Sequence, residues 1–198
     1  PGRVEALRRA GLARAICRYA DDGGRVLGSC GGYQMLGRRI EDPHGGEGGG
    51  PGRTEGLGLL GVTTRMTRAK ATVRVRFRPA GASPGPASDP LDAYEIHMGV
   101  TTPDPGVRPL FTVVERAGAK TLLAEGARDV SGRVRGTYLH GVFDHPALAD
   151  EILGLKGGGA WDAPSFRALR EASLDRLADA LEKHLDLKRV CAIAKIRP

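Results

Sequence analysis

The sequence is poor in aromatic residues and cysteine, and it has no long apolar run. Only 5% of its 198 residues are aromatic while 40% are hydrophobic, so aliphatic side chains must fill most of any core. No stretch approaches the roughly 20 apolar residues that cross a bilayer. The pattern of residues 4–19 predicts an amphipathic helix and not a secretory leader. We therefore expect a protein without a membrane partner, located in the cytoplasm.

Cysteine usage excludes a disulfide framework. The three cysteines, Cys17, Cys30 and Cys191, are odd in number, and no CxxC pair or zinc-type cluster of cysteine and histidine is present. This pattern is typical of a reduced compartment. It predicts no metal site and leaves open whether one thiol is reactive.

The formal charge of +7 raises the question of an acidic partner. The arginines are scattered along the chain, however, with no dense run and little aromatic interleaving. A nucleic-acid interface would gather its basic residues on one face. We therefore expect no nucleic-acid partner.

Hydrophobic periodicity predicts an α/β fold. Helical spacing is seen at the start of the chain and again near its end, and short apolar or alternating runs lie between them. A glycine-rich loop is predicted over residues 43–58 and a proline-rich loop over 79–92. One helix is predicted over residues 4–20, a second is predicted to begin at residue 33, and a third is marked by a stripe of apolar residues that ends at residue 185. The predicted strands cover 26–29, 59–66, 72–78, 94–100, 110–115 and 134–139. We expect one domain over residues 1–185 and a tail over 186–198, with a short strand around Cys191 and Ile193 as one option.

The segment around Cys30 has the spacing of a nucleophile elbow. Gly28-Ser29-Cys30-Gly31-Gly32 places the thiol between a short apolar strand and a helix start, with small neighbours on both sides. In such a turn the N–H of Gly31 points toward a developing oxyanion, and the helix N-terminus favours a thiolate. A buried structural cysteine beside incidental glycines explains the same spacing, because the chain contains 30 glycines.

A thiolate nucleophile needs a general base, and five histidines are available. His140 ends a predicted strand and precedes Gly141, where polar site residues project from α/β sheets. His44 lies in the predicted glycine-rich loop and His184 lies beside charged helix residues, so both are expected in solvent. A structural role for a single histidine remains the alternative.

Four segments together resemble one family. They are VLGSCGGYQMLG at 26–37, EGLGLLGV at 55–62, YEIHMGVT at 94–101 and GTYLHGVFDH at 136–145. In order and spacing they are similar to the class I glutamine amidotransferase domain of the cobyric acid synthase family, over about residues 3–185. The resemblance implies a mixed sheet flanked by helices, lacking the first strands of the class I fold.

The resemblance also implies the roles of individual residues. Cys30 would attack the side-chain amide of glutamine, His140 would act as general base and acid, and Gly31 would be an oxyanion donor. Residues that could bind substrate or orient the histidine are Gln34, Glu55, Glu95 and His97. No cofactor is implied in this domain. ATP and magnesium would be used by a synthetase partner that amidates carboxylates of a corrinoid acceptor, adenosylcobyrinic acid a,c-diamide.

Departures from the family pattern leave alternatives open. Many class I enzymes orient the histidine with a glutamate two residues later, where this chain has Val142. In the family, the early strands and the loop that gives a second oxyanion donor precede the matched region, so we expect this chain alone to hydrolyse glutamine poorly or not at all. The loop at 45–56 lacks the Gly-Lys-Ser/Thr ending of a phosphate-binding loop. A glutaminase for another acceptor (cobyrinic acid a,c-diamide or lipid II) and a non-catalytic docking module remain alternatives.

Overall fold

The computed structural model describes residues 2–46, 50–81, 89–145, 148–149, 152 and 166–196. The chain divides into two compact units, Pro1–Val142 with Ile152–Gly154, and Phe143–Glu151 with Leu155–Pro198. The domain over residues 1–185 and the tail over 186–198 stay a prediction.

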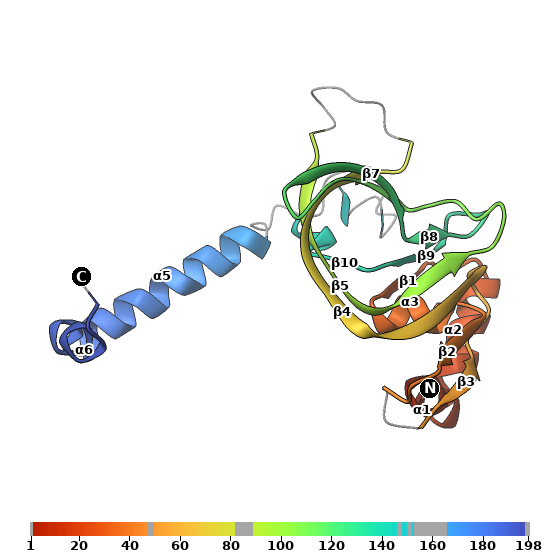
Figure 1. The fold of residues 1–198 in the computed structure, drawn as a ribbon, viewed down its shortest axis with the longest axis horizontal. Helices are drawn as coiled ribbons and strands as arrows, with labels where there is room; N and C mark the ends of the chain where they lie inside the picture. The colour runs from red at the N-terminus through yellow and green to blue at the C-terminus, as the bar shows by residue number, and fades with distance from the viewer. Residues whose placement is uncertain are drawn as a thin grey trace. The chain divides into compact units, whose positions relative to one another are not determined.

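The first unit contains two sheets with helices around them, which confirms the mixed α/β prediction (Figure 1). The smaller sheet has the order β1-β9-β8, and β1 and β9 run parallel. The larger sheet has the order β10-β5-β4-β2-β3, with β6 added on β4 and β7 on β6. The helices are α1 (Gly2–Arg9), α2 (Leu12–Asp21) and α3 (Gly31–Leu36), and the strands are β1 (Val26–Ser29), β2 (Arg39–Asp42), β3 (Gly52–Glu55), β4 (Val62–Pro79), β5 (Leu91–Pro103), β6 (Phe111–Arg116), β7 (Ala119–Glu125), β8 (Ala127–Arg128), β9 (Val134–Thr137) and β10 (Leu139–His140).

Strands β4 and β5 are the longest, and Figure 1 shows them as bent ribbons lying side by side. The two strands predicted over 59–66 and 72–78 are one continuous strand, β4, whose register against β5 shifts between Arg65 and Lys70. The predicted alternation is confirmed at its end, where Val75 and Phe77 are buried. A shift of this kind bends the strand without ending it. The apolar alternation is interrupted there, so the sequence pattern predicts two strands where the structure has one.

The start of the chain differs from the prediction. The expected single helix over 4–20 is two helices, because Gly11 between them adopts a left-handed conformation with φ 73°, which glycine accepts at little cost. The predicted loop over 43–58 contains β3, which pairs antiparallel with β2. Of the proline-rich loop at 79–92, residues 82–88 lie outside the described residues.

Among the described residues, two clusters of buried side chains pack helices against the sheets of this unit. The first joins α3 to the smaller sheet through Tyr33, Leu36, Val134 and Tyr138. The second joins α1 to the larger sheet through a set of aliphatic residues, Val4, Ile40 and Met66. Met35 of α3 packs against the second cluster, so α3 contacts both clusters.

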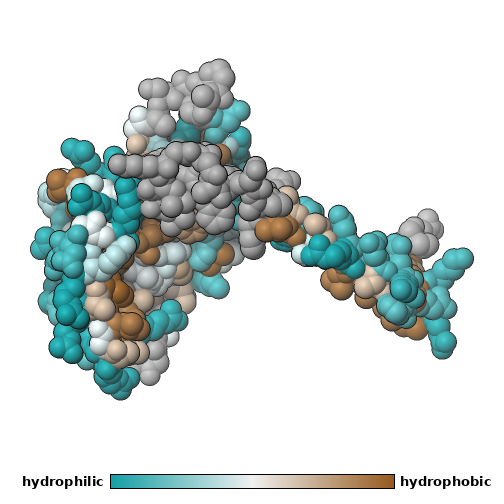
Figure 2. All heavy atoms as spheres, turned by 180° about the vertical axis from the view of Figure 1, so that it is seen from behind, coloured by the Kyte–Doolittle hydropathy of each residue, from teal (hydrophilic) through white to brown (hydrophobic). Residues whose placement is uncertain are grey.

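The second unit contains α5 (Phe166–His184) and α6 (Leu187–Ala194). The helix predicted to end at 185 is confirmed, and the option of a strand around Cys191 and Ile193 is wrong, since both residues lie in α6. The Asp186 side chain caps α6 by accepting from the N–H of Arg189 at 3.0 Å. Figure 2 shows apolar side chains at the surface of this unit, and those on α5 include Leu169, Leu177 and Leu181. Within the described residues, no helix has the length and apolar character needed to cross a bilayer.

Candidate active site

Cys30 occupies a strained turn between β1 and α3. Its backbone has φ 53° and ψ −114°, and among the described residues only Ala117 and Lys195 are other non-glycine residues with positive φ. Such conformations cost on the order of 1–3 kcal/mol and are kept where the surrounding structure enforces them. The strand, sharp turn and helix predicted for residues 26–37 are therefore confirmed.

The glycines around Cys30 differ in what they contribute. A Cβ at Gly28 would lie 2.7 Å from the backbone of Gly32 and Tyr33, so the strand can approach α3 only without a side chain there. A Cβ at Gly32 would meet nothing within 4 Å. Position 28 therefore requires glycine for steric reasons, whereas position 32 has space for a side chain.

Cys30 forms hydrogen bonds to both sheets. Its N–H donates to the carbonyl of Thr137 on β9 at 2.9 Å, which continues the parallel ladder that pairs Ser29 with Thr137. Its thiol donates to the carbonyl of Ile96 on β5 at 3.4 Å. The nucleophile candidate therefore lies at the junction of the smaller and larger sheets.

His140 lies on β10, opposite Tyr94 of β5. Its Nε2 is buried and has no hydrogen-bond partner among the described residues. Cys30 and His140 thus meet β5 at Ile96 and Tyr94, positions separated by about 7 Å along an extended strand. Although they are 110 positions apart in the sequence, both residues are thus anchored on β5 at positions two residues apart.

Gly31 provides the first N–H of α3, directly after Cys30. Gln34, one turn later, is buried and used internally: its Nε2 donates to the carbonyl of Met98 at 2.9 Å and to the hydroxyl of Tyr138 at 3.1 Å. The Tyr138 hydroxyl also bonds to Thr101. Gln34 therefore links α3 to β5 and to the segment before His140.

Glu95 and His97 form a pair on β5. The Nε2 of His97 lies 2.9 Å from Glu95 Oε1, and Arg116 Nε donates to Glu95 Oε2 at 2.8 Å. The hydrogen bond with His97 and then that of Arg116 lower the pKa of Glu95 to about 2, against the opposing effect of burial. The same bond to Glu95 raises the pKa of His97, whose ring stacks on Tyr138 with centroids 4.1 Å apart.

The glutamates considered for orienting His140 have other partners. Both carboxylate oxygens of Glu95 are used by His97 and Arg116. Glu55 lies on β3 and pairs with Arg53 at 2.8 Å. Four strand spacings, about 19 Å, separate β3 from β10 across the sheet. The structure therefore does not bring Glu55 to His140, and Val142 is buried.

Sequence reasoning missed Glu125, the last residue of β7. Its carboxylate accepts from the Thr137 hydroxyl and from the Tyr138 N–H, each at 2.7 Å. Burial raises the pKa of Glu125 to about 7. Its sequence context, Leu123-Ala124-Glu125-Gly126, gives no motif that marks a site.

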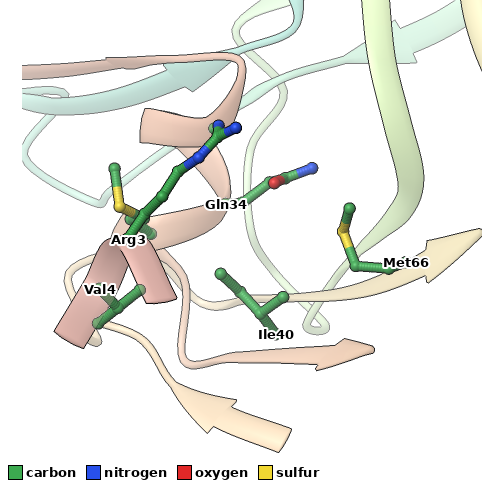
Figure 3. A pocket seen from close by; sticks show the side chains of 7 residues that line it. Arg3, Val4, Gln34, Ile40 and Met66 are labelled. Atoms are coloured by element: carbon green, nitrogen blue, oxygen red, sulfur yellow. The ribbon is translucent and has the colours of Figure 1, made fainter. Parts of the chain in front are cut away.

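A small cavity lies beside the elbow. Figure 3 shows Arg3 and Val4 of α1, Gln34 of α3, Ile40 of β2 and Met66 of β4 around it, and Gly31 also lines it. A volume of about 10 Å³ accommodates one water molecule, so the cavity as it stands is too small for glutamine. Within the described residues, no group of three or more His, Cys, Asp or Glu side chains is arranged to hold a metal ion.

Comparison with known proteins identifies relatives of this chain. Residues 2–148 match the model of the CobB/CobQ-like glutamine amidotransferase domain. The chain is 44% identical over 192 residues to the cobyric acid synthase of Azorhizobium caulinodans, covering 97% of this chain and 37% of that protein. It is 40% identical over 193 residues to the enzyme of Syntrophobacter fumaroxidans, covering 93% and 37%.

A third cobyric acid synthase, from Clostridium botulinum, is 37% identical over 191 residues, covering 94% of this chain and 38% of that protein. The chain thus spans less than two fifths of the length of these relatives. Among solved structures, PurLQS from Thermotoga maritima aligns with a TM-score of 0.46 at 15% identity, covering 71% of this chain and 62% of the other.

Proposed function

The chain belongs to the CobB/CobQ-like glutamine amidotransferase family, and from this premise we propose that it is the glutamine-hydrolysing part of a cobyric acid synthase. In this proposal Cys30 is the nucleophile and His140 is the general base and acid. The observation that carries the proposal is the strained turn at Cys30, with φ 53°, whose thiol reaches β5 two residues from the partner of His140. The Nε2 of that histidine has no partner among the described residues.

The proposed reaction has two stages. His140 first takes the thiol proton of Cys30, which points to Ile96 in the free protein, and the sulfur attacks the side-chain amide carbon of glutamine. The oxyanion that forms accepts a hydrogen bond from the Gly31 N–H at the start of α3. His140 protonates the departing ammonia and leaves a γ-glutamyl thioester. His140 then takes a proton from water, which attacks the thioester and releases glutamate and the thiol.

A buried imidazole nitrogen without a protein partner supports this role of His140. Such a nitrogen costs free energy unless a ligand or solvent uses it. Both carboxylate oxygens of Glu95 are hydrogen-bonded to His97 and Arg116. Glu95 is therefore not placed to form a hydrogen bond with His140. The pair therefore resembles a Cys–His arrangement in which no carboxylate of the described residues bonds the Nε2 of the histidine.

The second part of the proposal concerns the molecule that receives the ammonia. The relatives of this chain are cobyric acid synthases, and the ammonia would pass to an ATP- and magnesium-dependent synthetase part. Its acceptors would be peripheral carboxylates of adenosylcobyrinic acid a,c-diamide in cobalamin biosynthesis, in the cytoplasm. To test this, the chain would be mixed with the synthetase part of a cobyric acid synthase. Amidation of that corrinoid with glutamine as the nitrogen source supports the assignment. If free ammonia supports amidation and glutamine does not, the assignment is contradicted.

Selective labelling tests the nucleophile. An electrophilic glutamine analogue should modify Cys30 in preference to Cys17 and Cys191, as located by peptide mass spectrometry, and excess glutamine should protect it. Cys17→Ser and Cys191→Ser are matched controls that should keep the labelling, whereas Cys30→Ser should lose it. Loss of the base in His140→Asn should slow labelling by about 10²-fold or more. Equal modification of all three thiols, unaffected by glutamine, would refute the catalytic assignment.

A further inference from the structure

Glu125 lies where the chain passes from one sheet to the other. It ends β7 of the larger sheet, and β8 of the smaller sheet begins two residues later at Ala127. Gly126 between them has φ 68°, and a Cβ there would overlap the carbonyl of Gly136 on β9. The backbone at this crossing is therefore pressed against the strand that leads to His140.

A second crossing of the chain takes place at the same point. Strand β9 ends at Thr137 in the smaller sheet, and β10 begins at Leu139 in the larger sheet. The backbone N–H groups of residues at such a crossing leave one ladder before they join the next, so side chains must satisfy them. Glu125 accepts from the Tyr138 N–H at 2.7 Å, and the Thr137 hydroxyl accepts from the Leu139 N–H at 3.0 Å.

These bonds form one network around three consecutive residues. The Thr137 hydroxyl, fully buried, donates to Glu125 at 2.7 Å. The carbonyl of the same Thr137 accepts from the Cys30 N–H at 2.9 Å. One carboxylate thus holds the residue that anchors the nucleophile candidate and the two residues that lead into His140.

We propose that Glu125 is the positioning residue of the Cys30–His140 pair, holding the Thr137–Leu139 crossing so that thiol and imidazole meet the same substrate. This inference rests on the proposed glutaminase function. Glu125 contacts neither Cys30 nor His140 in any bond described above and acts through the backbone between them. It performs the task that a glutamate two residues after the histidine performs elsewhere in class I, but from a different strand and by a different route.

The charge state of Glu125 matters for this role, because a carboxylate accepts both bonds while a protonated carboxyl gives up one acceptor position. The ionisable groups that act on it electrostatically are Glu95, which raises its pKa, and His97, which lowers it, alongside the larger effect of burial. Its charge in turn raises the pKa of Tyr33. With a pKa of about 7, the network should tighten as pH rises through neutrality.

Kinetics of Glu125→Gln, with Glu125→Asp as the conservative variant, test the proposal. A misplacement of about 1 Å in a reacting pair costs about 10²-fold in rate, so we expect kcat for glutamine hydrolysis to fall about 10-fold to 100-fold with KM within about twofold. The acid limb of the kcat profile should shift in Glu125→Gln and return toward that of wild type in Glu125→Asp. Glu115→Gln, a carboxylate on neighbouring β6 paired with Arg76 at 3.7 Å, is the matched control and should behave as wild type.

Thr137 keeps the test decisive if Glu125→Gln does not fold. Thr137→Val removes the same network from its other end and should lower kcat in the same way, while Thr137→Ser should restore it. Wild-type kcat and an unchanged pH profile in Glu125→Gln, or in Thr137→Val, would overturn the inference, since a purely structural residue lowers only the melting temperature. Failure of the glutaminase proposal looks different: an electrophilic glutamine analogue would then show no glutamine-protected labelling of Cys30 in the wild type.

Discussion

The sulfur of Cys30 lies 3.4 Å from the carbonyl oxygen of Ile96. Cys30 follows β1 of the smaller sheet and Ile96 lies on β5 of the larger one, so this contact crosses between the sheets. Together with the bond from the Cys30 N–H to Thr137, it fixes the turn from two directions. A backbone in an unfavourable conformation is kept only under such double restraint.

The strain at Cys30 predicts an inverted order of stability between alanine and glycine. At φ 53° glycine is unstrained, so Cys30→Gly should be more stable than Cys30→Ala by about 1 kcal/mol. Cys17 in helix α2 is the matched control, since there Ala should exceed Gly by about 1 kcal/mol. Urea unfolding of the four variants measures both differences. The same sign at both positions would show that the turn at Cys30 is relaxed.

Gly28 and Gly32 should respond in opposite ways to alanine. The new methyl group in Gly28→Ala would press on the backbone of Gly32 and Tyr33, and overpacking of this kind costs about 1–3 kcal/mol. In Gly32→Ala the methyl group meets nothing within 4 Å, and the helical position should make alanine neutral or stabilising by up to about 1 kcal/mol. Thermal unfolding compares the two variants. A Gly32→Ala loss as large as that of Gly28→Ala would contradict the geometry of the elbow.

Much of the site could be predicted from local patterns, and the remainder could not for physical reasons. The strand, elbow and helix around Cys30 depend on residues adjacent in sequence, so the sequence pattern predicts them. Strand β3 is different: Gly52–Glu55 is mostly exposed and exists through pairing with β2, which no local periodicity records. Gly11 divides the first helix through a conformation that a periodic apolar pattern does not register.

Glu125 illustrates the same limit at the site. Its importance comes from two sheet crossings that meet in space, at Gly126 and at Tyr138. Neither crossing has a sequence signature, because each looks like a short break between apolar runs. The local structure at Cys30 could be predicted, whereas the carboxylate bonded to Thr137 and Tyr138 could be found only from the three-dimensional structure.

The Glu95–His97 pair should stabilise the fold within a limited pH window. The pKa of Glu95 is lowered to about 2 from an ordinary value near 4.5, so its contribution is present above pH 4.5 and is lost as pH falls toward 2. The pKa of His97 is raised, so its contribution is present below about 6.5 and is lost as pH rises through the raised value. The stability difference between wild type and Glu95→Gln should therefore be largest between about pH 4.5 and 6.5.

Urea unfolding at several pH values measures this window, and we expect a maximum difference of about 2–3 kcal/mol for loss of charged hydrogen bonds. Glu55→Gln, whose exposed pair with Arg53 is screened by solvent, should differ from wild type by less than about 1 kcal/mol at every pH. Histidine NMR should also show the pKa of His97 falling in Glu95→Gln. A difference that does not vary with pH would mean that the pair is not formed in solution.

The hydroxyl of Tyr138 joins three elements in front of the candidate site. It accepts from Gln34 on α3 and bonds to Thr101 on β5, while its ring meets that of Tyr33 edge-on with centroids 5.0 Å apart. Tyr138→Phe keeps the ring packing and removes only the hydroxyl, so Gln34 loses one of its two acceptors. We expect a loss of about 1–2 kcal/mol in the free energy of unfolding.

This loss should not vary between pH 6 and 9, because burial raises the pKa of Tyr138 above its ordinary value of 10 and the hydroxyl stays protonated throughout. Tyr94→Phe is the matched control, since Tyr94 is 48% exposed and its change should stay within about 0.5 kcal/mol. Chemical unfolding at three pH values distinguishes the two. If Tyr138→Phe were as stable as Tyr94→Phe, the hydroxyl would not hold Gln34 against the segment before His140.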